Sequence, residues 1–137
     1  MELNNVVVRL KNDAVLKGKT SDFFPNKTSF HLETLNGKIV RIDVEQLKAV
    51  FFVKDINGDA FRPDIYDDTI KGSGKKIKCT FIDGESIVGY TLGYSPDRHG
   101  FYMTPADLNG NNERIFVVKS ATQNVEFLWT EYCKILI

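Results

Sequence analysis

The most constraining feature of this chain is an internal repeat. Sliding the sequence by 71 positions places Gly18 on Gly89, and matching pairs continue without a gap over residues 6–34. The second copy then gains four residues, so that a shift of 75 places Val50 on Val125. A repeat of this kind means that one small unit is built twice. The 137 residues therefore divide into two units of about fifty residues with a segment between them.

Both copies have the pattern of short β-strands. Hydrophobic and polar residues alternate in Val6–Leu10 and in the equivalent Ile77–Phe81, which is typical of strands with one buried face. Turn sequences separate such segments, among them Asn12-Asp13 and Asp83-Gly84, where a positive φ suits a tight hairpin. A single helical turn is expected near Val44–Lys48. We predict five short strands per copy, roughly ten or eleven in all.

Gly18 and Gly89 fall inside predicted strands, where glycine normally weakens pairing. A sharp bend that lets a small sheet close would explain them, and closure also removes exposed sheet edges. We therefore predict an all-β protein of two tandem five-stranded barrels. Residues 1–54 would form the first barrel, and residues 75–137 the second, with a C-terminal strand. Residues 55–74 contain five Asp together with Gly and Pro, and we expect them to form an acidic linker.

The spacing of hydrophobic residues from Val6 to Gly18, around Asn12-Asp13, resembles the first signature of Sm-like proteins, and Cys79 to Gly89 is similar. This resemblance implies a hairpin of a strongly bent, SH3-like barrel of five strands. The second Sm signature, an Arg-Gly or Lys-Gly step between the last two strands, is missing, and the uracil-binding loop residues are not recognisable. The tandem also resembles an uncharacterised bacterial family whose members occur alone or beside signalling domains such as PilZ. That resemblance implies no known activity.

Charge and composition exclude several classes of protein. Eighteen Lys and Arg balance eighteen Asp and Glu, which rules out a nucleic-acid clamp held by bulk charge alone. A hydrophobic fraction of 42% is enough for a folded core. No apolar run is long enough for a transmembrane helix, and residues 1–5 lack a signal-peptide pattern, so we expect a cytoplasmic protein with no membrane contact.

The sequence offers no catalytic or metal-binding pattern. Cys79 and Cys133 lie far apart in apolar segments, where the expected role is that of small buried hydrophobic residues. His31 and His99 are not equivalent in the repeat, and neither has a partner at a spacing typical of a catalytic or metal site. We therefore expect a protein that is not an enzyme, with no metal and no cofactor.

The best candidate binding site is a pair of equivalent proline turns. Each combines aromatic, polar and cationic groups, a mixture suited to a peptide, a nucleotide base or a carboxylate. The alternative is that proline makes the turn, the aromatic residue enters the core and the cation is solvated. The candidate residues are Phe23, Phe24, Pro25, Asn26 and Lys27 in the first copy and Tyr94, Ser95, Pro96, Asp97 and Arg98 in the second.

Two functions remain open at this level. The favoured hypothesis is a non-catalytic binding or adaptor module that recognises a protein partner. The alternative is an Sm-like RNA-binding module in which loop aromatics stack on bases and Lys27 and Arg98 contact phosphates. RNA binding predicts that Lys11 and Lys27, with two further lysines of the first copy, cluster on one face. The apolar end Ile135–Ile137 is expected to dock as an extra strand or to join two chains into a homodimer.

Overall fold

The computed structural model describes residues 3–56, 75–95, 97–105 and 111–128. The first half of the chain contains five strands and one short 3-10 helix: β1 (Asn4–Leu10), β2 (Val15–Thr20), β3 (Ser29–Thr34), β4 (Ile39–Asp43), η1 (Val44–Gln46) and β5 (Leu47–Val53). The second half repeats this order: β6 (Lys75–Phe81), β7 (Ser86–Thr91), β8 (Gly100–Pro105), β9 (Asn112–Val118), η2 (Lys119–Ala121) and β10 (Thr122–Phe127). The predicted all-β class and the helical turn near Val44 are confirmed, whereas the second turn, η2, was not predicted.

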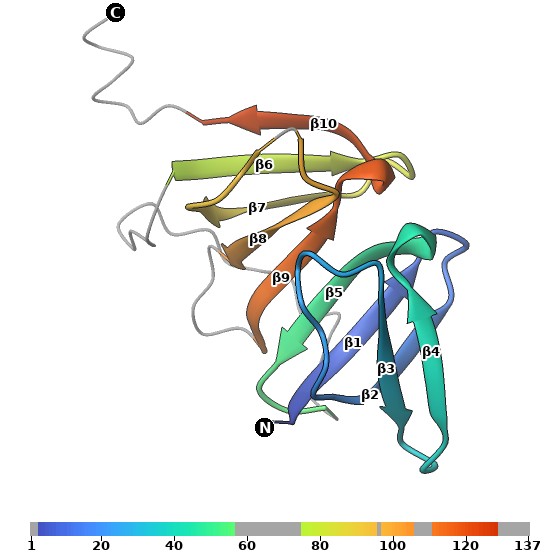
Figure 1. Cartoon of the computed structure of the whole chain (residues 1–137). Coiled ribbons are helices and arrows are strands. Elements are labelled where there is room, and N and C mark those ends of the chain that lie inside the picture. The colour runs from blue at the N-terminus through green and yellow to red at the C-terminus, as the bar shows by residue number, and fades with distance from the viewer. Residues whose placement is uncertain (1–2, 57–74, 96, 106–110, 129–137) are drawn as a thin grey trace, which may run out of the picture.

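The ten strands form one antiparallel sheet in the order β10-β6-β7-β8-β9-β5-β1-β2-β3-β4 (Figure 1). Each half has the same internal order, with its last strand beside its first. The prediction of two separately closed barrels is not confirmed, because no pairing among the described strands closes either half on itself. Instead the free side of β5 pairs with β9 of the other half, so the edge that closure would have removed is covered by the second copy.

Local structure follows the predicted turns and glycines. Asp13, Gly37 and Gly84 have the positive φ angles that the hairpin sequences require. A Cβ atom on Gly18 would lie 2.2 Å from the carbonyl oxygen of Glu33, and the equivalent atom on Gly89 would be almost as close to β8. The two glycines are therefore needed because neighbouring strands approach too closely for any side chain.

The junction of β5 and β9, which we call the seam, contributes side chains to two hydrophobic cores. Along β5, Val50 and Phe52 point into the first core, whereas Ala49 and Phe51 point into the second. The side chains of β9 also point alternately into the first and the second core. The first core consists of Val6, Val8, Phe30, Leu32, Ile42, Val44, Leu47, Val50 and Phe52 with Phe116 and Val118 of β9. The second consists of Ile77, Cys79, Phe81, Phe101, Met103, Ile115, Val117 and Ala121 with Val7, Ala49, Phe51 and Val53 of the first half. Each half thus completes the core of the other.

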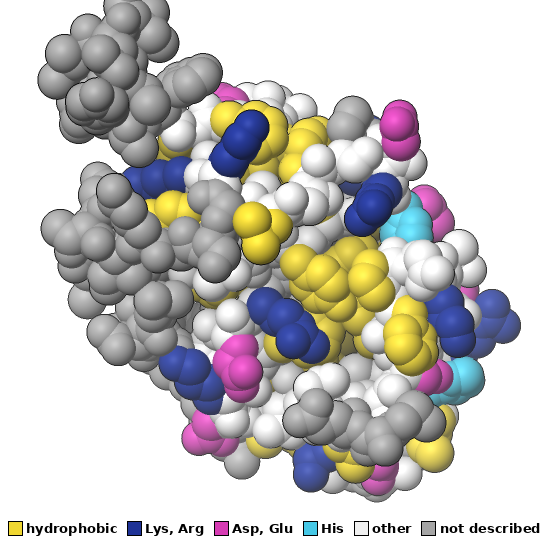
Figure 2. Space-filling view, turned by 60° about the vertical axis from the view of Figure 1, so that its left-hand side comes forward, with side chains coloured by type: hydrophobic (Ala, Val, Ile, Leu, Met, Phe, Trp, Pro, Cys, Tyr) yellow, Lys and Arg dark blue, Asp and Glu magenta, His cyan; other side chains and the backbone are white. Residues whose placement is uncertain are grey.

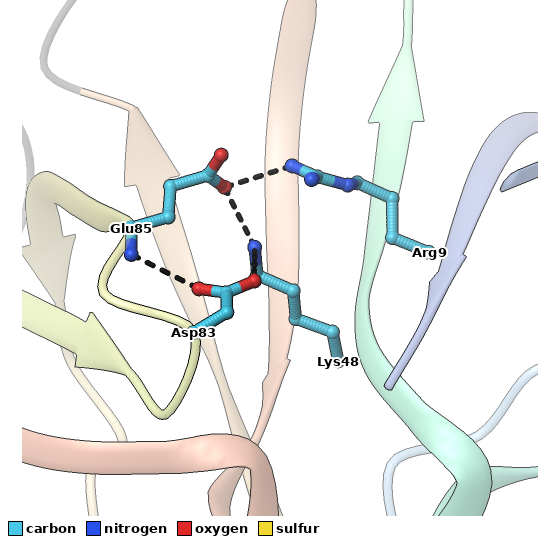
Figure 3. A network of polar contacts seen from close by, with 4 residues as sticks. All are labelled: Arg9, Lys48, Asp83 and Glu85. Atoms are coloured by element: carbon cyan, nitrogen blue, oxygen red, sulfur yellow. Dashed lines mark hydrogen bonds and ion pairs between the residues drawn. The ribbon is translucent and has the colours of Figure 1, made fainter. Parts of the chain in front are cut away.

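A polar network also joins the halves (Figure 3). Lys48 of β5, whose side chain is only 4% exposed, places its Nζ 2.7 Å from Asp83 Oδ2 and 2.9 Å from Glu85 Oε1. Arg9 of β1 binds the same Glu85 oxygen at 2.7 Å. The Lys48 ammonium also lies 4.7 Å from the centre of the Phe81 ring. Buried charge is tolerated here because two carboxylates from the β6–β7 turn meet it directly.

Some predictions fall outside the described residues. These are most of the proposed linker (57–74) and the C-terminal residues 129–137, which include Cys133. Cys79 is fully buried, as predicted, and burial raises the pKa of its thiol from 9.0 to about 12. The described part of the chain contains no helix with the length and apolarity needed to cross a bilayer.

Candidate functional site at the junction of the two halves

The two proline turns begin with the same core contact. In the loop between β2 and β3, the Phe23 ring packs edge-on to Phe30 at a centroid distance of 5.0 Å and to Phe52 at 5.7 Å. In the second half, Tyr94 makes the equivalent contacts with Phe101 and Phe127 at the same two distances. The first aromatic residue of each loop therefore belongs to the core and is not free to stack on a ligand.

Both loops also close the predicted turn. The backbone N–H of Lys27 donates to the carbonyl of Phe24 at 3.0 Å, and that of Arg98 donates to Ser95 at 3.2 Å. Pro96 lies outside the described residues. Phe24 is 43% exposed, and the Lys27 ammonium lies 4.8 Å above its ring. The first loop thus presents an apolar ring and a cation to solvent.

The first loop lies against the second half of the chain. Phe23 reaches Phe116 of β9 at 5.1 Å and Tyr102 of β8 at 6.4 Å. Beside this contact is a pocket of about 270 Å³, lined by Pro25, Tyr90, Leu92, Gly93, Arg98, Gly100, Phe101, Tyr102, Thr104 and Phe116. Pro25 and Arg98, one residue from each proline turn, therefore line the same pocket.

Two of the pocket residues, Gly93 and Tyr102, stand where the first half has a polar pair. In the first half, Asp22 accepts hydrogen bonds from the backbone N–H of His31 at 2.9 Å and pairs with the His31 ring at 2.7 Å. The equivalent residues in the second half are Gly93 and Tyr102, which cannot form this pair. Nothing lies within 4 Å of where a Gly93 Cβ would be, so the missing side chain leaves open space. In the second half, the pocket therefore lies at the position where, in the first half, Asp22 holds its loop to β3.

The Asp22–His31 pair fixes the loop between β2 and β3 to strand β3. Burial alone would raise the pKa of Asp22, but the hydrogen bonds from His31 and Thr20 outweigh it and leave the pKa below 3.8. The carboxylate is therefore charged and holds the loop to the strand. Its partners are the backbone and ring of His31 and the hydroxyl of Thr20, and we assign these contacts a structural role.

One arginine, Arg98, lines the pocket, and a second, Arg114, lies near Tyr102 of its wall. The Arg98 side chain is exposed and makes no ion pair with any described residue. The Arg114 guanidinium lies 4.2 Å from the centre of the Phe52 ring and 5.5 Å from that of Tyr102. No Asp or Glu is among the lining residues. On the face of the molecule drawn in Figure 2, hydrophobic side chains gather at the centre, with Lys and Arg and some acidic and His side chains around them.

Tyr102 supplies a neutral polar group at the wall. Burial raises the pKa of its hydroxyl, and the nearby Arg114 only partly offsets this effect. The hydroxyl therefore stays protonated at neutral pH and can donate or accept a hydrogen bond. Leu92, which is 82% exposed, forms an apolar rim.

The described residues of the predicted site divide into four groups. Pro25 and Arg98 line the pocket, and Phe24 with Lys27 stands on the adjoining loop surface. Phe23 and Tyr94 are core residues, whereas Asn26, Ser95 and Asp97 do not line the pocket. The sequence interpretation missed Leu92, Gly93 and Tyr102. A signal was present in the repeat, because these are positions at which the aligned copies differ in chemistry.

The described residues contain no group of three or more His, Cys, Asp or Glu side chains placed to hold a metal ion.

A family model with the description "Family of unknown function (DUF6982)" matches residues 2–129. No curated protein and no solved structure matches the chain.

Proposed function

We propose, for a chain that belongs to this family of unknown function, a non-catalytic role as a binding module that recognises a segment of a partner protein. The observation that carries the proposal is the junction pocket, to which Pro25 of the first half and Arg98 of the second both contribute. A site assembled from two loops that are distant in sequence depends on the folded arrangement of the whole chain. It offers a shaped apolar surface with a cation at its rim, as protein interfaces commonly do.

The chemistry of the pocket favours a particular kind of peptide. Leu92 and Tyr102 can cover one large apolar side chain, and Arg98 can pair with a carboxylate beside it. The open space at Gly93 lets a peptide backbone approach closely. We therefore expect a ligand segment in which Asp, Glu or a chain terminus lies next to an aromatic or large aliphatic residue.

The proposal includes the finer fold assignment, in which each half is a bent Sm-like or SH3-like unit. It is supported by the strand order β5-β1-β2-β3-β4, repeated as β10-β6-β7-β8-β9, and by the close approach of strands at Gly18 and Gly89. It also assigns the module to the cytoplasm. There it would act as an adaptor, in keeping with the resemblance to bacterial proteins found beside signalling domains.

The position of the lysines favours a peptide over RNA. Lys11 lies at the turn before β2, where its Nζ donates to Ser120 Oγ of the second half at 2.7 Å. Lys27 lies beyond the other end of β2, above Phe24. The two lysines therefore lie in loops at opposite ends of β2. The single basic face that the RNA hypothesis requires is therefore not supported.

The test is a selection of random displayed peptides on the immobilised full chain. We expect enrichment of sequences that combine a carboxylate with a large apolar residue. The matched variants are Gly93→Asp, which refills the pocket with the carboxylate found at Asp22, and Asn26→Asp, which adds the same charge outside it. Gly93→Asp should weaken binding about tenfold or more, equivalent to ~1.4 kcal/mol, and Asn26→Asp should leave it nearly unchanged.

Two outcomes would overturn the proposal. One is the absence of any enriched peptide, and the other is enriched peptides that bind the Gly93→Asp variant as tightly as the unaltered chain. Filter retention of mixed RNA at low salt is measured in parallel. Retention that Lys27→Gln and Arg98→Gln abolish would favour RNA as the ligand.

A further inference from the structure

The seam has a counterpart at each outer edge of the sheet. The repeat makes β10 equivalent to β5 and β4 equivalent to β9, each with a shift of 75. Strands β10 and β4 are the two ends of the sheet, so each has one side without a strand beside it among the described residues. A second copy of the chain could in principle use these edges to repeat the β5–β9 pairing head to tail.

The outer strands differ from the seam strands at the positions that matter for such pairing. On β5, Ala49 and Phe51 enter the core of the other half, and their equivalents on β10 are the exposed Asn124 and Glu126. On β9, Phe116 and Val118 enter the first core. Their equivalents on β4 are Arg41 and Asp43, whose side chains are 69% and 53% exposed.

A second copy in the seam register would bury these charges. Arg41 and Asp43 would point into the second core of the neighbouring chain, and Glu126 would point into the first core of the other. The seam register places Arg41 opposite Val125 and Glu126 opposite Val40, on opposite faces of the sheet. Arg41 and Asp43 form an exposed ion pair at 3.5 Å, which burial would strip of water without bringing a further partner. Because the charges of the two strands cannot neutralise each other, Glu126 would be buried with no opposite charge beside it, which is strongly unfavourable.

The polar network has no counterpart at the outer edges either. Lys48 and Arg9 correspond to Gln123 and Thr80, and the acidic pair Asp83 and Glu85 corresponds to Asn12 and Ala14. Every charged member is replaced by an uncharged residue. An edge-to-edge contact between two chains would therefore lack the ion pairs that fix the halves of one chain.

We infer that the seam is a self-terminating interface. It joins the first half to the second within one chain, and the polar residues of β4 and β10 prevent a second copy from extending the sheet by the same pairing. Among the described strands the seam therefore occurs once, and the pocket lined by Pro25 and Arg98 is formed once with it. This inference is independent of what the pocket binds.

Two edge variants test it when they are mixed. The first carries Arg41→Phe and Asp43→Val, which gives β4 the residues of β9. The second carries Asn124→Ala and Glu126→Phe, which gives β10 the residues of β5. Each variant alone retains one polar edge and should keep the mass of the wild-type chain in light scattering. An equimolar mixture should give a new one-to-one complex of twice that mass, because only then do two apolar edges meet.

A control variant carries Lys19→Val and Glu33→Phe, which adds apolar surface to the paired inner strands β2 and β3. It should form no complex with either edge variant. The inference is overturned if the mixture contains nothing larger than its components, or if the control assembles equally well. It is also overturned if either edge variant forms that complex with the wild-type chain, because the polar edge would then not be a block. Circular dichroism of each variant confirms that it is folded before mixing.

Discussion

Strands β5 and β10 occupy equivalent places in the repeat and have opposite environments. All seven residues of β5 are buried, whereas β10 has no fully buried residue. Strand β5 has neighbours on both sides and a core on each face, while among the described strands β10 has β6 alone beside it. The repeated unit therefore fixes the place of a strand within its half. The burial of that strand depends on whether it lies in the seam or at an outer edge of the sheet. The apolar residues Ala49, Phe51, Phe116 and Val118 of the seam correspond to the polar residues Asn124, Glu126, Arg41 and Asp43 of the outer strands.

The largest expected contrast between seam and edge is in stability. Phe51 is 9% exposed and reaches the core of the other half, so Phe51→Ala leaves a cavity and should lower the free energy of unfolding by about 3–5 kcal/mol. Glu126 is its exposed equivalent, and Glu126→Ala should change stability by no more than about 0.5 kcal/mol. Urea unfolding monitored by fluorescence measures both. Equal effects of the two substitutions would mean that β5 is no better buried than β10.

We expect a smaller difference in stability between substitutions in the polar network and matched substitutions at the outer edge. Lys48→Met keeps the volume of the side chain and removes both ion pairs, which should lower stability by roughly 1–3 kcal/mol. The loss is limited because Asp83 and Glu85 are 38% and 43% exposed and can be hydrated. Gln123→Met is the matched change at the outer edge and should be neutral within about 0.5 kcal/mol. A neutral result for Lys48→Met would show that the network does not stabilise the seam.

The same network predicts a pH dependence. The hydrogen bond from Lys48, aided by the backbone N–H of Glu85, holds the pKa of Asp83 below its ordinary 3.8. The stabilisation is therefore complete above the pKa of the unfolded chain and is lost as the pH falls through the lower, folded-state pKa. An NMR titration should show the Asp83 carboxyl pKa rise toward 3.8 in Lys48→Met and stay unchanged in Gln123→Met. An unchanged Asp83 pKa in Lys48→Met would contradict the assigned cause.

The sequence was sufficient to predict the elements of each half. Alternating segments, hairpin turns and strand glycines depend on local constraints that both copies share, and Gly18 and Gly89 illustrate this. The seam was not predicted, because it depends on positions at which the copies differ. Val7, Ala49 and Phe51 are apolar in the first half, and the equivalent residues are Lys78, Asn124 and Glu126. Such differences indicate which faces become buried only once the strand order is known.

The candidate site was predicted in part for the same reason. Repetition of the proline turns drew attention to Pro25 and Arg98, which do line the pocket. The residues that open it, Gly93 and Tyr102, break the repeat by replacing the Asp22–His31 pair. Comparison of matching positions therefore identified the fold of the loops, and only the differing positions could have identified the cavity between them.

Amide hydrogen exchange tests most directly the claim that the two halves form one sheet through the seam. The amides of β5 and β9 that face each other should exchange only through global unfolding, as slowly as those between β1 and β2. The amides of β4 and β10 that face away from the sheet should exchange far faster. Seam amides that exchange as fast as the outer-edge amides, with protection retained inside each half, would contradict the account.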